Sequence, residues 1–312
     1  MKIAIPDLVS NSYFPAIAAA ELGLWEAEGV DMKLELLFPV TTAMEALRDG
    51  QYDFVAGTAS APLTAFPDWN GVKIVAALAQ RMYWFLVLRS DLKAERGDVQ
   101  AVKGLRIGAA PGVDVGLKRL LREVGIDPET EVHIGPVPGT SAASVSFGVT
   151  AAEALAAGKL DGFWANGMGA EVAVRRGVGT IILDIRRGDG PKPAWTYTFP
   201  ALVTRADLIE RQPDAVAGAI RGLIGAQKLL ASDPSRATEV GKRVFPAMEA
   251  ELIADLIRRD APYYDPAVTP EIVADLNHFA QDVGLLSTAV PYENVVATQF
   301  SHLWKERWTL DA

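Results

Sequence analysis

A twelve-residue segment occurs twice in this chain of 312 residues, and the repetition restricts the fold more than any other feature of the sequence. Residues 42–53 read TAMEALRDGQYD and residues 150–161 read TAAEALAAGKLD. Seven of the twelve positions are identical without a gap, namely T, A, E, A, L, G and D. The repetition indicates two structurally equivalent units, one in each of two lobes, although common helix-end residues can also recur by chance.

Each copy carries the signals that begin and end a helix. Thr42 and Thr150 each lie three residues before a glutamate, which predicts that the hydroxyl and the carboxylate cap the first helical turn reciprocally. Gly50 and Gly158 follow the helical stretch and suit the left-handed conformation of a helix C-terminus. Because the residues after each final aspartate are apolar and read as a strand, each copy predicts a helix, a turn and a strand.

Strand and helix signals alternate in the rest of the chain, which predicts an α/β fold. Strands are expected at residues 2–5, 33–37, 51–56, 73–79, 83–88 and 106–109, and helices at 15–28, 43–49 and 116–124. Six more helices are expected at residues 206–211, 213–232, 234–245, 248–259, 269–283 and 293–305. Two apolar segments, 81–89 and 194–204, suit strands that cross between the lobes. We therefore predict that residues 1–85 and 195–312 form lobe one and that residues 86–194 form lobe two.

The composition favours a globular protein that handles small molecules. Half of the residues are apolar and 22% are charged, as in chains with a substantial core. The net charge of −9 argues against nucleic acid or an anionic membrane as the main partner, because either would need a clustered basic surface. The chain has no cysteine, which excludes disulfides, thiolate metal sites and cysteine nucleophiles.

The sequence shows no targeting or membrane segment. No apolar stretch approaches the roughly 20 residues of a membrane span. The chain begins MKIAIP, directly in a strand pattern. We therefore expect either a periplasmic protein whose leader has been removed or a cytoplasmic protein.

Several phrases of the sequence, in order along the chain, resemble the solute-binding proteins of ABC importers for alkanesulfonates, taurine, nitrate and thiamine pyrimidine precursors. They are residues 14–30 (FPAIAAAELGLWEAEGV), 46–57 (ALRDGQYDFVAG), 103–108 (KGLRIG), 154–161 (ALAAGKLD) and 201–214 (ALVTRADLIERQPD). Each phrase alone is common in α/β proteins, but together they extend over essentially the whole chain. The resemblance implies a type II periplasmic-binding-protein fold: two lobes, each a mixed sheet flanked by helices, joined by two crossing strands that act as a hinge. It also implies that a monomer captures a small organic molecule in the cleft between the lobes and passes it to an ABC permease. No cofactor is expected.

Loops in both lobes supply candidate ligand contacts, because ligands of such folds bind at the carboxyl ends of strands, where loops lead into helix N-termini. In lobe one the candidates are Ser10, Asn11, Ser12, Tyr13, Thr58, Ser60, Gln80 and Trp84. In lobe two they are Gly112, Asp114, Thr140 and Ser141 of the loop 137–148, Trp164 and Asn166. The duplication places Trp164 and Asn166 after the strand equivalent to the one that delivers Thr58. The alternative is that the polar residues only cap helices or connect elements, and that the aromatic residues pack in the core.

Asp114 bears on the charge of the expected ligand. Residues 108–116 resemble the turn that receives the anion in this family, where sulfonate and nitrate binders place hydroxyl residues or glycine. A carboxylate there would repel an anion, so we expect a neutral heterocycle, or an aromatic or amine-bearing molecule, rather than sulfonate or nitrate. This expectation depends on Asp114 facing the cleft.

An enzyme on the same fold is the alternative function. The three histidines, His133, His278 and His302, lack metal-ligand spacing, and neither a G-x-S-x-G elbow nor a nucleotide-binding motif occurs. The fold's relatives include a cysteine-dependent desulfinase, a pyrimidine synthase that consumes a histidine, and aromatic-acid decarboxylases. The missing cysteine and scarce histidine disfavour the desulfinase and the pyrimidine synthase. The alternative function is therefore an enzyme such as an aromatic-acid decarboxylase or a different pyrimidine-precursor enzyme. A transcription-regulator effector domain would need a helix-turn-helix segment that this chain does not contain. No residue is nominated as catalytic or as a metal ligand.

Overall fold

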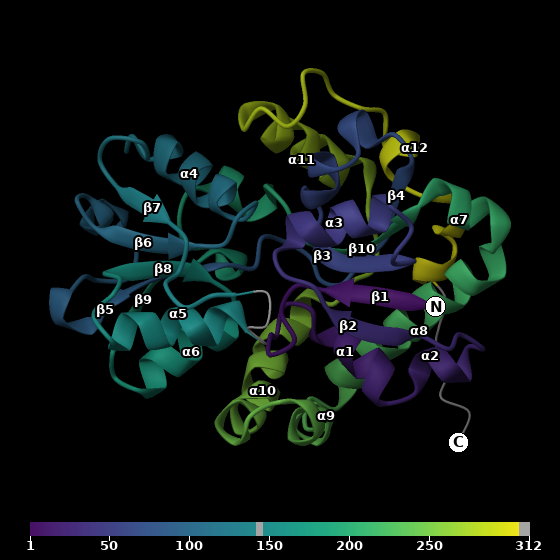
Figure 1. Cartoon of the computed structure of the whole chain (residues 1–312), viewed down its shortest axis with the longest axis horizontal. Coiled ribbons are helices and arrows are strands. Elements are labelled where there is room, and N and C mark those ends of the chain that lie inside the picture. Colours follow the sequence, from purple (N-terminus) through teal and green to yellow (C-terminus); the bar gives the residue numbers. More distant parts are fainter. Residues whose placement is uncertain (142–145, 306–312) are drawn as a thin grey trace.

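The computed structural model describes residues 1–141 and 146–305, which form two lobes, each built on a five-stranded mixed sheet (Figure 1). Sheet one contains β1 (Lys2–Ile5), β2 (Lys33–Leu36), β3 (Phe54–Thr58), β4 (Val72–Ala77) and β10 (Pro200–Arg205). Sheet two contains β5 (Phe85–Arg89), β6 (Arg106–Ala109), β7 (His133–Gly135), β8 (Gly162–Ala165) and β9 (Gly179–Asp184). We call the unit on sheet one lobe one and the unit on sheet two lobe two. The predicted two-lobed α/β fold is confirmed.

The two sheets share one topology. Their orders are β2-β1-β3-β10-β4 and β7-β6-β8-β5-β9, so β1 to β4 occupy the same places as β6 to β9. The remaining strand of each sheet, β10 or β5, runs antiparallel to both of its neighbours. The chain enters sheet two on β5 and returns to sheet one on β10, which gives the two predicted crossings. The predicted lobe boundaries at 85/86 and 194/195 stay a prediction.

Helices cover both faces of each sheet (Figure 1). They are α1 (Phe14–Glu21), α2 (Leu24–Ala27), α3 (Val40–Arg48), α4 (Asp114–Glu123), α5 (Phe147–Ala156), α6 (Gly167–Arg175), α7 (Ala206–Arg211), α8 (Pro213–Ser232), α9 (Arg236–Val244), α10 (Ala247–Asp260), α11 (Pro270–Asp282) and α12 (Tyr292–Val295). None of the helices in the described part of the chain is long and apolar enough to cross a membrane.

Two of the predicted helices are interrupted. The helix expected over 15–28 is divided into α1 and α2, because Gly23 adopts a left-handed conformation with φ of 68°. The helix expected over 293–305 is wrong as well: α12 ends at Val295, and only short 3₁₀ turns follow up to residue 305.

Alternating side chains on β1 bury both faces of sheet one. Ile3 and Ile5 pack in the core beneath α1 and α8, whereas Ala4 belongs to the core beneath α3. Figure 1 shows α3 on one side of this sheet and α1 and α8 on the other. A strand buried on both faces reads as a nearly continuous apolar run, which explains why these segments were recognisable in the sequence.

The repeated segments form equivalent elements, α3 with β3 and α5 with β8, but their helices begin earlier than predicted. Gly50 and Gly158 are left-handed, with φ of 74° and 68°, as expected at helix C-termini. The threonine caps are wrong. Ser146 caps α5 by accepting from Val149 N at 3.2 Å, so Thr150 lies inside the helix and its hydroxyl donates to Ser146 O at 2.8 Å.

Candidate ligand-binding site

A pocket lies between the lobes at the carboxyl ends of the strands, where ligands of such folds bind. Its walls are formed by Pro6, Asp7, Ser12, Tyr13, Phe38, Val40, Tyr83, Trp84, Ala110, Val113, Phe147, Trp164, Ala165 and Asn166. Phe38 of lobe one stacks on Phe147 of lobe two with ring centroids 6.0 Å apart, so the lobes meet directly beside the pocket.

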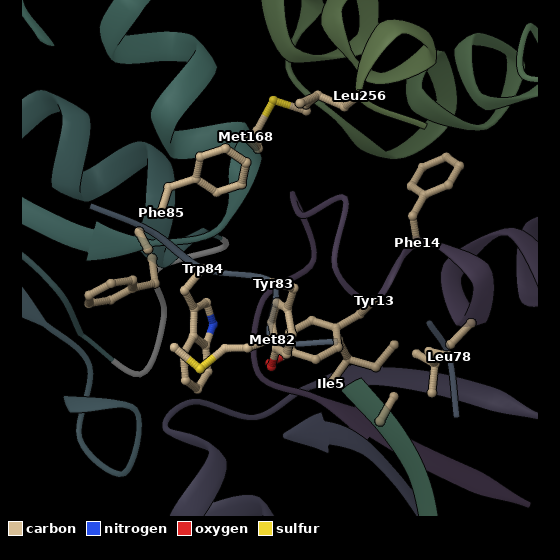
Figure 2. Packing of buried hydrophobic residues seen from close by; sticks show 14 of the residues in the cluster. Ile5, Tyr13, Phe14, Leu78, Met82, Tyr83, Trp84, Phe85, Met168 and Leu256 are labelled. Atoms are coloured by element: carbon tan, nitrogen blue, oxygen red, sulfur yellow. The ribbon is translucent and has the colours of Figure 1, made fainter. Parts of the chain in front are cut away.

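A row of aromatic rings crosses the pocket from one lobe to the other. Tyr13 lies 6.0 Å from Tyr83, Tyr83 lies 4.9 Å from Trp84, and Trp84 lies 5.9 Å from Trp164, measured between ring centroids. Figure 2 shows Tyr13 and Tyr83 close together, with Trp84 next along the crossing segment. This wall suits the flat face of an aromatic or heterocyclic ligand.

Two polar groups in the wall have no hydrogen-bond partner among the residues that the structure describes. They are the indole Nε1–H of Trp164, whose residue is fully buried, and the hydroxyl of Ser12, whose residue is 1% exposed. A buried donor without a partner costs about 1–3 kcal/mol. A ligand that brings an acceptor to Trp164 would remove that cost.

Asp7 is the carboxylate of the pocket, and it connects the lobes. Its Oδ2 accepts from Asn166 Nδ2 (2.8 Å), Phe147 N (3.1 Å), Ser146 Oγ (3.4 Å) and Gly148 N (3.5 Å), and its Oδ1 accepts from Val9 N (3.0 Å). The side chains of Ser146 and Asn166 cap α5 and α6, so Asp7 lies at the positive ends of two helix dipoles. Burial nevertheless outweighs these hydrogen bonds and raises the pKa of Asp7 to about 7.

Asn11 joins the lobes a second time and reaches a buried ion pair network. Its Oδ1 accepts from Met168 N at 3.0 Å, and its Nδ2 donates to Asp260 Oδ2 at 2.6 Å. Asp260 pairs in turn with Arg186 at 3.1 Å and with Arg187 at 2.8 Å. The first loop of lobe one is therefore anchored to lobe two at its start, by Asp7, and at its middle, by Asn11.

The nominated hydroxyls of Thr58 and Ser60 lie in lobe one behind the tyrosines. Thr58 Oγ1 lies 2.8 Å from Thr198 Oγ1, which also accepts from Ser60 N at 3.2 Å. Tyr13 OH lies 3.0 Å from Tyr83 OH, and burial raises the pKa of both phenols, so both are neutral at pH 7. Thr58 is thus engaged within the protein.

The structure places five of the fourteen nominated residues in the pocket wall: Ser12, Tyr13, Trp84, Trp164 and Asn166. The other nine lie outside the wall as described: Ser10, Asn11, Thr58, Ser60, Gln80, Gly112, Asp114, Thr140 and Ser141. Gln80 donates to the carbonyls of Asp265 and Ala267, and Thr140 donates to Val137 O at 2.7 Å. Residues 142–145 of the nominated loop lie outside the described residues. A role for any of these side chains in binding stays a prediction.

Asp114 does not line the pocket. Its Oδ1 accepts from Gly112 N at 3.2 Å, and its Oδ2 lies 3.3 Å from Lys118 Nζ on the same helix. The argument from Asp114 to the charge of the ligand therefore fails. The carboxylate that does face the pocket is Asp7, which the sequence interpretation missed. Its position directly after the first strand was the available signal.

In residues 1–141 and 146–305, no group of three histidine, aspartate or glutamate side chains could hold a metal ion.

Comparison with known proteins identifies the family and the fold. Residues 8–244 match the model of the NMT1-like family. The fold is similar to the periplasmic aliphatic sulphonate binding protein SsuA from Escherichia coli, with a TM-score of 0.69, 14% identity and coverage of 95% of this chain and 91% of that chain. It is also similar to the periplasmic nitrate-binding protein NrtA from Synechocystis PCC 6803, with a TM-score of 0.72, 16% identity and coverage of 96% and 86%.

An enzyme shares the fold too. The desulfurization enzyme DSZB matches with a TM-score of 0.63, 14% identity and coverage of 96% of this chain and 97% of that chain. No curated protein matches the sequence. At these identities the solved structures show the fold alone, whereas the family model matches 237 of the 312 residues, counted from 8 to 244. The chain belongs to the NMT1-like family.

Proposed function

We propose that the protein is a solute-binding component of an ABC importer that captures one small aromatic or heterocyclic molecule between its lobes. The family, and the likeness of the fold to the sulphonate- and nitrate-binding proteins, support the solute-binding role. The proposal includes delivery to a permease and a periplasmic location, which the same likeness supports. Capture is reversible, because the two crossing segments let the lobes close on the ligand and open again.

The single observation that carries this proposal is the unpartnered indole Nε1–H of Trp164 in an aromatic pocket between the lobes. Proteins rarely leave a buried donor without a partner, and an acceptor on a ligand in the pocket would supply one. The row of rings from Tyr13 to Trp164 favours a planar ligand. Asp7 would repel an anion, which supports a neutral heterocycle or an amine-bearing molecule over sulfonate or nitrate.

A thermal-shift screen of aromatic acids, sulfonates, pyrimidines and amines, followed by mass spectrometry of each hit, tests the proposal. A ligand that binds the native state raises the melting temperature by mass action. Recovery of that ligand unchanged supports a binding protein. Its conversion to a product would instead favour an enzyme, such as an aromatic-acid decarboxylase or a pyrimidine-precursor enzyme.

Substituting Trp164→Phe is expected to weaken binding of the hit by roughly tenfold, because the ring remains but the donor is lost. The melting temperature of the free protein should fall, because Trp164 is fully buried and the smaller phenyl ring leaves a cavity, so binding is compared well below the melting temperatures of both proteins. Isothermal titration calorimetry on both proteins measures the difference. Trp195→Phe is the matched control, because Trp195 Nε1 donates to Asp189 O at 3.1 Å outside the pocket. Equal affinity of wild type and Trp164→Phe would refute the assigned role of Trp164.

A further inference from the structure

Asp7 is a buried carboxylate in the pocket wall, with no cationic partner. The residue is 4% exposed, and no lysine, arginine or histidine within residues 1–141 and 146–305 pairs with it. Removing a charge from water is costly unless an opposite charge or several donors compensate for it. Asp7 has donors but no opposite charge.

The groups that face Asp7 do not supply that charge. Lobe two presents the amides of Phe147 and Gly148, the hydroxyl of Ser146 and the side-chain amide of Asn166, which are all uncharged. Lobe one presents the neutral phenol of Tyr13, and the crossing presents that of Tyr83.

The cation that packs on Tyr83 is already paired. The guanidinium of Arg186 lies 5.7 Å from the centroid of Tyr83, but it forms an ion pair with Asp260 at 3.1 Å. The elevated pKa of Asp7, about 7, agrees with incomplete compensation of its charge. A positively charged ligand in the pocket would complete the compensation of the Asp7 charge.

The rest of the wall is also suited to a cation. Tyr13, Tyr83, Trp84 and Trp164 form a continuous row of rings, and the faces of such rings attract ammonium groups, most strongly where water is excluded. A carboxylate beside an aromatic wall is the complement of an organic ammonium ion.

Given the proposed function, on which this inference rests, we propose that the ligand is an organic cation, an aromatic molecule with a protonated or quaternary amine. Asp7 is its counter-ion and determines the charge of ligand that the pocket accepts. The helix ends of α5 and α6 hold the Asp7 carboxylate in place. An anionic ligand would meet this carboxylate instead of free amides.

Three probes with the same benzyl group test the inference: benzyltrimethylammonium, benzyl alcohol and phenylmethanesulfonate. By calorimetry at pH 8, the cation should bind at least about tenfold more tightly than the alcohol, and the sulfonate should bind most weakly. In Asp7→Asn, which keeps an acceptor for the helix amides, the preference for the cation over the alcohol should fall by at least about fivefold, to what the aromatic wall alone provides. Asp114→Asn removes a carboxylate outside the pocket and should keep the wild-type order.

The pH dependence is a second measurement that needs no variant. Benzyltrimethylammonium carries a permanent charge, so only the protein titrates. The cation requires ionised Asp7, whose pKa in the free protein is about 7. The dissociation constant in wild type should therefore be about tenfold higher at pH 6 than at pH 8, and it should not change with pH in Asp7→Asn.

Several outcomes would overturn the inference. Equal affinity of wild type for cation and alcohol contradicts it, as does a cation preference that is undiminished in Asp7→Asn. An affinity for the cation that does not vary with pH also contradicts it. If the affinity for a probe still falls in Trp164→Phe, the proposed function stands. Failure of all three probes to bind also overturns it. The proposed function itself falls if the wider ligand screen finds no ligand or if the protein converts a hit to a product.

Discussion

Replacing Asp260 by alanine is expected to lower the free energy of unfolding by about 3–5 kcal/mol, since removing one partner of a buried ion pair leaves the other charge uncompensated. Asp260 and Arg186 are each 2% exposed, and one carboxylate serves Arg186, Arg187 and Asn11. Arg186 Nη2 already has no partner among the described residues. In the alanine variant, Nη1 of Arg186 would also lose its partner, and the buried guanidinium would lose the opposing charge of Asp260.

Urea unfolding followed by circular dichroism measures this loss. The matched control is Asp255→Ala on the same helix, α10. Asp255 pairs with Arg258, and both side chains are more than half exposed. Exposed pairs contribute little, so the control should change stability by no more than about 1 kcal/mol. A loss in Asp260→Ala as small as that of the control would show that the network does not stabilise the fold.

Asp7→Asn is expected to stabilise the free protein at pH 8 by up to about 4 kcal/mol and to have little effect at pH 4. In the unfolded chain Asp7 ionises near pH 3.8, but in the folded protein burial raises its pKa to about 7. Between these values the folded protein binds the extra proton. The contribution of Asp7 to stability is thus greatest below pH 3.8, and it falls as the pH rises through 7.

Unfolding of wild type and Asp7→Asn in urea at pH 4, 6 and 8 measures this effect as the difference between the two proteins. The two proteins have to be compared because other carboxylates make the protein less stable at low pH, which is opposite to the effect of Asp7. Asp161, for example, is held by Arg106 with a pKa of about 2, and its contribution is lost in acid. A difference between the two proteins that stays constant from pH 4 to pH 8 would contradict the prediction.

The elements that were predicted correctly have their signals within a few adjacent residues. The bounds of β1, β6, α7 and α8 agree with the expectation to the residue. Gly50 and Gly158 end their helices as expected, because a left-handed residue is a local requirement. Ser146 lies only four residues before Thr150, so two hydroxyls compete to cap the same helix, and the structure assigns the cap to Ser146.

The site was less predictable, because its contacts join residues far apart in the chain. Asp7 meets Asn166 159 positions later, and Asn11 meets Asp260 249 positions later. A position after a strand nominates Asp7 and Asp114 alike, but only Asp7 faces the pocket, whereas Asp114 folds back on its own helix. Thr58 seemed free in the sequence, but its hydroxyl is engaged by Thr198 on the returning segment.

The position of β10 between β3 and β4 determines the order in which the two lobes can fold during synthesis. All five strands of sheet two have been synthesised once the chain reaches Asp184. Sheet one has to wait for Pro200–Arg205, because β4 joins the sheet through β10. Domains generally fold as units during synthesis. We therefore expect lobe one to be completed last, although its first strand, β1, is synthesised first. Until β10 is made, the edges of β3 and β4 that later pair with it remain unpaired.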